Sequence, residues 1–336
     1  MEIAAGPASS PICLAAILNK LEFWVDTMTG GRRPSRGNLE LRHLRYFLAV
    51  AEELNYGRAA ERLRIAQPGL SQQIRTLEEI VGTLLFDRSR RTVSLTLAGE
   101  LFLVEARKTL AQADTALVAA QRAGRGEVGR IAIGYVASAA YTGILTSLVG
   151  SFRRAHPEVE LQITEMEMQR QLEALAEDRL DIGFIRPPVS LPVGITSFPL
   201  LQEGVLLALP DTHALAEAES VELAALAADT FITPRHGTGV SFHRHTVKAC
   251  QAAGFHPLLG PQGQDFVTIA SMVAVGLGVA LVPQSVRCIQ LPGIVYRAVA
   301  GPAIVAELAL GYRRTEPSPA ARNFTQHARG FRVGPG

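Results

Sequence analysis

Residues 65–79 read IAQPGLSQQIRTLEE, and this stretch decides the fold of the N-terminal part of the chain. Pro68 stands where the first turn of a helix tolerates proline. Apolar residues recur at helical spacing and form one face of the predicted helix. They are Leu70, Ile74, Leu77 and Val81. The opposite face has amides, a hydroxyl and an arginine in place of Glu/Lys pairs. A helix fits the major groove of DNA, where such side chains match the donors and acceptors of base edges. The alternative is a polar face that is only solvated.

The segments on either side of this stretch complete a helix–turn–helix pattern. A second helix is expected around residues 58–64, where Ala59 and Ala60 are small enough to let another helix approach closely. LLFDRSRRTVSLT, residues 84–96, alternates apolar and polar residues and predicts a small hairpin with arginines at its tip, Arg88, Arg90 and Arg91. A first helix is predicted before them from apolar residues at helical spacing, namely Leu41, Leu44, Leu48, Ala51 and Leu54, with Phe47 beside this stripe.

A long helix is predicted from Leu97 to about Arg122, with Thr96 as its cap. Within it, leucine and alanine alternate with separations of three and four residues, at Leu103, Ala106, Leu110, Ala113, Leu117 and Ala120. This is the spacing of a coiled-coil seam, and the small alanines would let two such helices pack closely. The pattern therefore predicts dimerisation through this helix. The alternative is a helix that packs on its own domain.

Residues 123–129, AGRGEVG, predict a hinge, and strand and helix patterns alternate beyond it. RIAIGY, VELQIT and DIGFIR are separated by helical patterns, as in a parallel sheet with helices on both faces. GVLLALP, FITP, GVALVP and IVYRAV form a second set with two more helices, and ELALGYRR and a final helix follow. We therefore expect two α/β lobes and a cleft between them, since ligands bind at the carboxyl ends of strands in such sheets.

These patterns divide the chain into four parts. They are residues 1–38, a disordered or mis-assigned extension with a Gly/Arg/Pro/Ser stretch; 39–96, a winged helix–turn–helix; 97–128, a linker helix and hinge; and 129–330, a two-lobed domain. Lobe I is expected at about 129–200 plus 305–330, and lobe II at about 201–304.

Composition narrows the class of protein. The formal charge of +2 does not by itself indicate nucleic-acid binding, because a local basic surface can be hidden in a nearly neutral total. Cys13, Cys250 and Cys288 are far apart and lack CxxC spacing, so neither a disulfide framework nor a zinc site is indicated. No apolar run reaches the length of a membrane span, and PICLAAIL lacks the basic residues of a secretory signal. We expect a cytoplasmic protein without a membrane partner.

Enzyme signatures are missing from the sequence. It contains no HExxH, GxSxG or Walker loop, so no enzyme and no cofactor are predicted. His236, His243, His245 and Cys250 could suggest a metal, but His243 and His245 are two residues apart on a predicted helix and point to different faces. No metal site is predicted. An enzymatic or solute-binding α/β domain fused to an adaptor helical domain is the alternative function.

The segment LELRHLRYFLAVAEELNYGRAAERLRIAQPGLSQQIRTLEEIVGTLLFDRSRRTVSLTLAGE, with the linker helix and lobes, resembles the LysR-type transcriptional regulators over nearly all of the chain after residue 38. The resemblance implies a winged helix–turn–helix, a dimerising linker helix and an effector domain similar to periplasmic binding proteins. It also implies a homodimer or homotetramer on partly palindromic promoter DNA and a small-molecule effector, with RNA polymerase as a possible partner. The implied DNA-binding residues are Arg58, Gln67, Pro68, Ser71, Gln72, Gln73, Arg75, Arg88, Arg90 and Arg91.

Two departures from the family pattern stand out. PGLS occurs where PPLS or PSLS is frequent, so Gly69 removes a side chain from the first turn of the recognition helix. Family chains often begin MELRHLRYF, and Leu39 occupies the place of that methionine. We therefore expect the natural start at or near Leu39, through a non-methionine start codon.

IGYVASAAY, FRRAHPEVELQITEM and GLGVALVP are similar to the family subgroup that senses aromatic acids, muconates and related catabolic intermediates. The resemblance puts Ser138 at a helix N-terminus that could hold a carboxylate, and Arg186 and Asp265 opposite each other across the cleft. A helix cap and a structural ion pair are the alternatives. Met168 stands where a threonine often grips a carboxylate, and a thioether cannot donate a hydrogen bond. The implied effector residues are Ser138, Ala139, Met168, Arg186, Val240, Phe242, Asp265 and Phe266.

Overall fold

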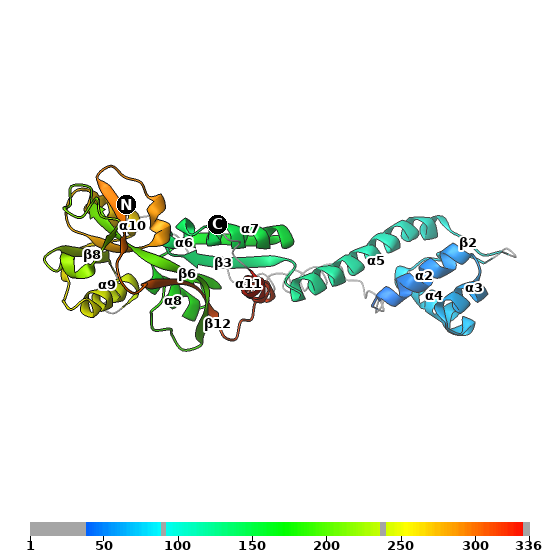
Figure 1. Ribbon diagram of the computed structural model, residues 1–336. Coiled ribbons are helices and arrows are strands. Elements are labelled where there is room, and N and C mark those ends of the chain that lie inside the picture. The colour runs from blue at the N-terminus through cyan, green and yellow to red at the C-terminus, as the bar shows by residue number, and fades with distance from the viewer. Residues whose placement is uncertain (1–37, 89–91, 236–239, 332–336) are drawn as a thin grey trace, which may run out of the picture. The chain divides into compact units, whose positions relative to one another are not determined.

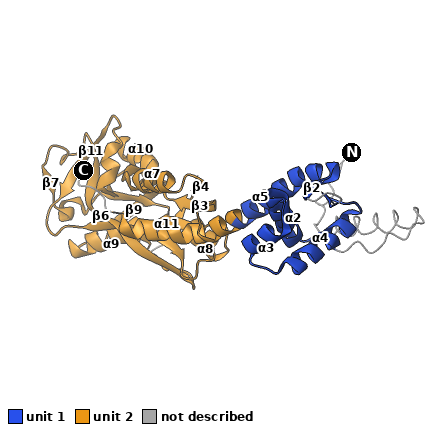
Figure 2. Cartoon of the chain, turned by 90° about the vertical axis from the view of Figure 1, so that its right-hand side faces the viewer, with its two compact units in different colours: residues 1–117 blue, residues 118–336 orange. Residues whose placement is uncertain are grey.

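The computed structural model describes residues 38–88, 92–235 and 240–331. The chain forms two compact units, residues 1–117 and 118–336, which are described separately and coloured in Figure 2. Several residues of the sequence predictions lie outside the described ranges, namely residues 1–37 of the extension, Arg90, Arg91 and His236.

The first unit is a winged helix–turn–helix, as predicted. Its elements are α2 (Leu41–Glu53), α3 (Tyr56–Leu63), α4 (Gln67–Val81), β1 (Phe86–Asp87), β2 (Ser94–Leu95) and the first part of α5 (Leu97–Gly124). β1 and β2 pair antiparallel, Phe86 with Leu95, which confirms the hairpin. Pro68 lies in the first turn of α4, and Gly82 ends this helix with a positive φ of 79°. Thr96 Oγ1 accepts a hydrogen bond of 2.9 Å from the backbone N–H of Gly99, so the predicted cap of α5 is confirmed.

The core of this unit corrects part of the predicted helix faces. Leu70, Ile74 and Leu77 of α4 are fully buried, as expected. In α2, however, the buried residues are Leu44, Phe47 and Val50 together with His43 and Ala49, while Leu41 and Leu54 are exposed. The sequence pattern followed leucines, whereas the helix turns Phe47 inward against Phe86 and Phe102, at centroid distances of 5.2 and 5.0 Å.

The second unit is the two-lobed α/β domain that the alternating patterns predicted (Figure 1). In lobe I, β3 (Gly129–Tyr135) pairs in parallel with β4 (Val159–Glu165) and β5 (Ile182–Ile185). Side chains of β3 alternate between two apolar clusters. Ile131 and Ile133 face α7 (Ile144–Ala155) and α11 (Pro319–Gly330), and Ala132 faces the cluster of α8 (Met168–Ala176). Helices therefore cover both faces of the sheet.

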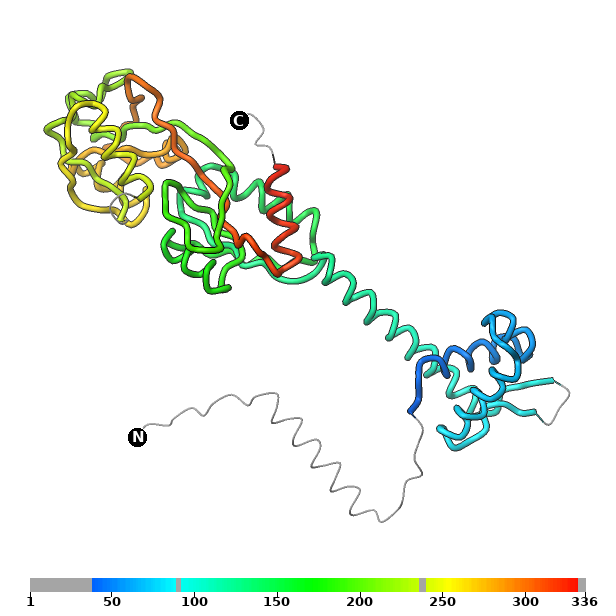
Figure 3. Tube along the Cα trace, turned by 90° about the horizontal axis from the view of Figure 1, so that it is seen from below, coloured from blue at the N-terminus to red at the C-terminus, as the bar shows by residue number. Residues whose placement is uncertain are grey.

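In the described part of this unit, β6 (Ile195–Pro210) and β12 (Val305–Arg313) connect the lobes. β6 pairs with β12 over its first part and with β10 (Ala280–Pro283) and β11 (Ile294–Val299) over its last part. The expected lobe boundary at 200/201 thus falls inside one continuous strand. After β12 the chain returns to lobe I, where α11 packs beside α7 (Figure 3), with Phe152 and Phe324 in edge contact at 4.9 Å.

Lobe II is built around the last part of β6. Its remaining elements are β7 (Ser220–Val221), η1 (Leu223–Leu226), β8 (Thr230–Pro234), α9 (Ser241–Ala252), β9 (Leu258–Gly263), α10 (Phe266–Ala274) and η2 (Gln284–Cys288). β8 and β9 pair in parallel, so their carboxyl ends lie at the same edge. β7 pairs with β11. One apolar cluster unites these elements and includes Phe231, Phe242 and Ile269. The short α6 (Ala137–Tyr141) lies at the carboxyl end of β3 in lobe I.

Candidate functional site

The outer face of α4 separates the predicted polar residues into two groups. Gln67, Pro68, Gln72 and Arg75 are exposed, whereas Ser71 and Gln73 are half-buried. Oε1 of Gln73 is buried and has no hydrogen-bond partner among the described residues. The two amides of Gln67 and Gln72 and the guanidinium of Arg75 therefore point to solvent and are not packed in the core. Ala66, which precedes α4, supplies no side-chain cap to the helix N-terminus. The first N–H groups of α4 are thus available to an anion such as a phosphate.

The arginines near α4 differ in their freedom. Arg58 is exposed but donates to the backbone carbonyl of Glu53 at 2.7 Å. Arg88, predicted at the hairpin tip, forms an ion pair of 2.8 Å with Glu78 and lies over the Tyr56 ring at 5.7 Å. Arg88 therefore fastens the base of the hairpin to the helical core.

Glu78 is a structural residue that the sequence pattern did not single out. Its side chain is 5% exposed, and Oε1 accepts hydrogen bonds from the backbone N–H groups of Leu85 and Phe86 at 2.9 and 3.2 Å. Because Oε2 holds Arg88, one buried carboxylate positions both β1 and the start of the hairpin. The sequence could have indicated this role, because an acidic residue directly follows Leu77 of the apolar stripe.

The main cavity of the second unit lies between the lobes and has a volume of about 920 Å3. Lobe I contributes residues that follow β3 and β4, and lobe II contributes residues at the ends of β8 and β9. The cavity therefore opens at the carboxyl ends of parallel strands, where ligands of such sheets bind. Its lining comprises Val136, Ala137, Ser138, Thr164, Glu165, Met166, Glu167, Met168, Arg170, Glu173, Arg179, Pro234, Arg235, Gln264, Asp265 and Phe266.

The structure brings four of the predicted effector residues to this cavity, Ser138, Met168, Asp265 and Phe266. The other four, Ala139, Arg186, Val240 and Phe242, are not part of its lining. Phe242 is buried behind Phe266, and the two rings meet edge to face at 5.1 Å. Met168 is also mostly covered, since it packs into the apolar cluster of α8.

Arg186 has a different partner from the expected one. Its Nη2 forms an ion pair of 2.7 Å with Oε1 of Glu203 in β6, in place of the expected pairing with Asp265. Glu203 in turn accepts from the backbone N–H and the hydroxyl of Ser285 at 2.6 and 3.2 Å. Burial lowers the pKa of Arg186, and the charge of Glu203 opposes that shift. The buried pair therefore joins β5, β6 and η2.

Arg186 also contacts Ser138. Nε of Arg186 donates to the hydroxyl oxygen of Ser138 at 2.9 Å. Ser138 is 4% exposed, lines the cavity, and makes no hydrogen bond as a donor within the described part of the chain. Its hydroxyl proton is therefore available to an acceptor in the cavity.

The cavity wall has many charged groups that sequence analysis missed. They are Glu165, Glu167, Arg170, Glu173, Arg179 and Arg235. Arg179 pairs with Glu177, outside the cavity. The sequence could have indicated some of these residues, because they follow predicted strands. The carboxyl ends of parallel strands lie at the same edge of the sheet.

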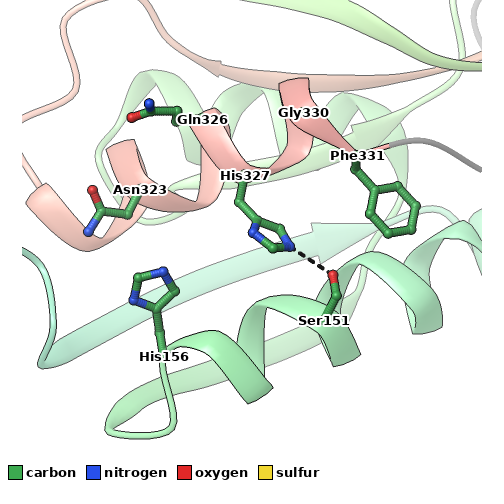
Figure 4. A pocket seen from close by; sticks show the side chains of 7 residues that line it. All are labelled: Ser151, His156, Asn323, Gln326, His327, Gly330 and Phe331. Atoms are coloured by element: carbon green, nitrogen blue, oxygen red, sulfur yellow. Dashed lines mark hydrogen bonds between the residues drawn. The ribbon is translucent and has the colours of Figure 1, made fainter.

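A second cavity, of about 620 Å3, lies between α7 and α11 (Figure 4). Ser151 and His327 are hydrogen-bonded there at 2.8 Å. The Ser151 hydroxyl also lies 2.9 Å from the carbonyl oxygen of Leu148. A hydroxyl has one proton, so its bond to Leu148 competes with donation to His327. The lining residues include no acid that would orient the imidazole as a general base.

The described residues, 38–88, 92–235 and 240–331, contain no further candidate site built from thiols or metal ligands. No group of three or more His, Cys, Asp or Glu side chains there could hold a metal ion. Burial raises the pKa of the Cys250 thiol to about 11, so this thiol is protonated near neutral pH. No helix in the described ranges is long and apolar enough to cross a membrane.

Comparison with known proteins covers both units. Residues 41–100 match the family model described as a bacterial regulatory helix-turn-helix protein of the lysR family, and residues 124–332 match the LysR substrate binding domain. The chain is 39% identical to the uncharacterized HTH-type transcriptional regulator YnfL of Escherichia coli K12, over 86% of this chain and 98% of the relative. It is 36% identical to the HTH-type transcriptional regulator AlsR of Bacillus subtilis 168, over 85% and 94%.

Solved structures agree with these matches. The crystal structure of CbnR, a LysR family transcriptional regulator, is similar with a TM-score of 0.71 and 29% identity, over 87% of this chain and 100% of that chain. Full-length CbnR complexed with its target DNA has a TM-score of 0.70, with 29% identity over 87% of this chain and 99% of that chain. Full-length BenM has a TM-score of 0.52 and 32% identity, over 87% and 96%.

Proposed function

The chain belongs to the LysR family of DNA-binding transcriptional regulators, and from this premise we propose that α4 reads promoter DNA under the control of a small molecule in the interlobe cavity. The single observation that supports this function best is the outward set on α4, Gln67, Gln72 and Arg75, whose side chains have no polar partner among the described residues. The family is one of regulators, so the enzymatic alternative is not favoured. Because DNA is its target, we propose a cytoplasmic location.

The proposed contacts divide between base edges and phosphates. Gln72 and Arg75, with Gln67, Ser71 and Gln73 at the margins, are positioned on α4 for the major groove. Pro68 and the uncapped helix N-terminus are suited to a phosphate. Arg58, Arg88, Arg90 and Arg91 would fix position rather than sequence. The complex of the similar regulator CbnR with its target DNA supports this assignment.

The proposed effector is a small anionic or aromatic molecule, as in the subgroup that senses aromatic acids and muconate-like intermediates. The free hydroxyl proton of Ser138 supports a carboxylate contact, and Val136, Met166 and Phe266 offer apolar surface for a ring. Ala139, Arg186, Val240 and Phe242 lie outside the lining, and two of them contact it. Arg186 orients Ser138, and Phe242 supports Phe266.

We propose that paired chains bind two half-sites about one helical turn apart or a multiple of it, as a dimer or tetramer. The exposed residues of α5 support this assembly. Leu117 and Ala120 of the predicted seam are exposed, whereas Leu103, Ala106 and Leu110 pack on the core of their own unit. Ala113 is half-buried. A second apolar stripe, Leu97, Leu101 and Val104, is exposed on the opposite side of the helix.

Control by the effector requires that it bind one arrangement of the lobes better than another. Among the residues that the structure describes, β6 and β12 are the strands that link the lobes within one sheet, so a bend in these strands would close the cavity. We propose that closure changes how dimers sit along DNA, which activates or represses transcription. An effector that leaves both the footprint and the DNA bend unchanged would contradict this coupling.

Sequencing of genomic fragments retained by the purified chain tests the function. Enrichment of a few partly palindromic sites is expected, and the genes beside them would nominate the pathway of the effector. Retention should fall steeply with salt, because each phosphate contact releases counterions. Uniform recovery of fragments would show that the chain is not a sequence-specific regulator.

A further inference from the structure

The cavity between α7 and α11 has no part in the function proposed above. It shares no lining residue with the interlobe cavity, and its volume is about 620 Å3 (Figure 4). Polar side chains from both helices and the aromatic ring that follows α11 form its lining, namely Ser151, His156, Asn323, Gln326, His327 and Phe331. The lining contains no aspartate or glutamate, so a cation would find no carboxylate there.

Two imidazole rings in this cavity rest on one phenyl ring. Phe152 is fully buried, His156 stacks on it at a centroid distance of 4.4 Å, and His327 meets it edge to face at 5.6 Å. Figure 4 shows both imidazoles in the gap between α7 and α11. Nε2 of His327 lies 2.8 Å from the Ser151 hydroxyl. Nδ1 of His327 and both nitrogens of His156 have no hydrogen-bond partner in the described part of the chain, so they are available to a ligand.

The two imidazoles would repel each other if both were protonated. Burial lowers the pKa of His327, and the charge of His156 lowers it further. A nearby negative charge has the opposite effect, because it favours the protonated form of each ring. An anion held between the rings should therefore bind together with a proton near neutral pH.

Arg154 adds a positive charge at the rim of the cavity. It follows Ser151 by three residues, so the two are neighbours on the surface of α7. Nη1 of Arg154 lies 3.6 Å from the position of a Cβ on Gly150, so the guanidinium folds back along the helix towards the level of Ser151. The side chain is exposed and forms no ion pair with the residues that the structure describes. Arg153 is rotated from Ser151 by about 200° and therefore lies on the other side of α7.

The two amides of the lining differ in their freedom. Nδ2 of Asn323 donates to the carbonyl oxygen of Arg125 at 2.8 Å, so this donor is used by the segment between α5 and β3. Gln326 is exposed, and its amide has no partner among the described residues. An acceptor in the cavity could thus receive hydrogen bonds from the Gln326 amide, the two imidazoles and the Arg154 guanidinium.

We propose that this cavity is a second ligand site, which binds a phosphate group between His156, His327 and Arg154. A phosphate has several oxygens that accept from different donors at once, and guanidinium groups bind it strongly. The group can come from inorganic phosphate or from a small monoester, since the cavity has room for an organic part beside Phe331. The site is independent of the interlobe cavity and of DNA.

Titration calorimetry of inorganic phosphate and of phenyl phosphate into the full chain tests the site. Chloride keeps the ionic strength constant. At least one of the two should bind, with proton uptake at about pH 6.5, the ordinary pKa of histidine, measured as a dependence of the heat on the buffer. Tighter binding of phenyl phosphate would identify a monoester site, and tighter binding of inorganic phosphate a site for the free ion. If neither binds, or if binding takes up no proton, the proposal is wrong.

Two neighbouring arginines give a matched pair of variants. Arg154→Gln should weaken phosphate binding by at least about tenfold, because it removes a hydrogen bond between charged groups. Arg153→Gln removes the same charge from the same helix and should leave the affinity unchanged. Both side chains are exposed, so neither change should unfold the chain. Equal affinities of the two variants would show that phosphate responds only to the total charge, which overturns the site.

Labelling with diethyl pyrocarbonate, read by mass spectrometry of peptides from the full chain, locates the bound phosphate. Phosphate should slow the labelling of His156 and His327, whose ring nitrogens it covers. The exposed His256 is the internal control and should react at the same rate with and without phosphate. Unchanged labelling of His156 and His327 in saturating phosphate would place the ion elsewhere on the chain, and the proposal would fail.

Discussion

Gln72 and Gln73 are adjacent in the sequence but differ in what they can contact. Gln72 is exposed on α4, whereas Gln73 is half-buried. Gln72→Ala should therefore relax base preference, at a cost of about 1–3 kcal/mol on the preferred sequence if the contact is bidentate. Fluorescence anisotropy on the selected site and on single-base variants measures this. Arg90→Ala is the comparison, since it should weaken binding to all sequences alike. Equal losses on specific and random DNA for both variants would contradict the assignment of Gln72.

His327 gives unit 118–336 a dependence on pH. Burial lowers the pKa of His327, and the charge of His156 lowers it further. The folded-state pKa is thus below the unfolded value of about 6.5, so stability is fully present above that pH and falls as pH drops below it. His327→Gln, which can still donate to Ser151, should reduce the loss of Tm between about pH 7 and pH 5. The effect should stay below about 1 kcal/mol because the ring is partly solvated.

Thermal melts across this pH range measure the effect of His327. The exposed His256→Gln is the control and should leave the pH dependence unchanged. If the Tm of His327→Gln falls with pH as steeply as that of the wild type, other groups cause the loss of stability.

Single residues show which contacts the sequence could predict. Ser138 and Asp265 follow strands and precede or begin helices, so their place at the cavity could be inferred from the resemblance. The partner of Arg186 could not, because it depends on the sheet order β5-β12-β6, which brings Glu203 beside it. Strand order is set by long-range packing, and residue spacing does not encode it.

At the scale of elements, two helical glycines should respond in opposite ways to alanine. A Cβ on Gly99 would lie 2.1 Å from the carbonyl oxygen of Leu85, where α5 meets the hairpin. Gly99→Ala should therefore destabilise unit 1–117 by about 1–3 kcal/mol. A Cβ on Gly69 in α4 meets nothing within 4 Å, so Gly69→Ala should stabilise the helix by up to about 1 kcal/mol.

Urea denaturation of both variants measures the difference. Stabilisation by Gly99→Ala would mean that α5 can shift from the hairpin at little cost. Gly69→Ala also restores a side chain at the position where the family pattern usually has one, and its effect on DNA affinity can be measured on the same sample.

Helix faces mark the limit of prediction at this scale. The spacing of α5 predicted a seam at Leu103, Ala106 and Leu110, and those residues are indeed apolar and covered. The covering surface is the helix–turn–helix of the same chain, the alternative that the sequence left open. Periodicity identifies the buried face of a helix but does not identify its partner.

For the whole molecule, the alternation of strands and helices was enough to predict two α/β lobes. It did not predict that β6 would run through both, because the pattern of ITSFPLLQEGVLLALP contains a proline and polar residues that suggest an interruption. Because β6 is continuous, the strands of both lobes belong to one hydrogen-bonded sheet. A cavity between them is therefore bounded by two groups of strand ends whose separation depends on how the linking strands bend.

Assembly should depend on the exposed stripe of α5. Leu101 and Val104 are 65% and 53% exposed and lie on the opposite face from the covered seam. Leu101→Gln with Val104→Gln should weaken dimerisation and barely change the melting temperature, because neither residue belongs to the core. Affinity for DNA with two half-sites should fall by more than about tenfold, since the second contact is no longer intramolecular. Affinity for a single half-site should stay the same.

Sedimentation velocity and anisotropy on duplexes with one and two half-sites measure these effects. Thr109→Gln with Ala116→Gln, on an exposed flank of α5, is the matched control. If the stripe variant remains as oligomeric as the control and binds paired half-sites as tightly, the stripe is not the contact between chains. If it loses oligomers but keeps its affinity for paired half-sites, each chain binds DNA independently. If the stripe variant, but not the control, loses both its oligomers and its affinity for paired half-sites, recognition of a whole promoter site requires the pairing of two α5 helices.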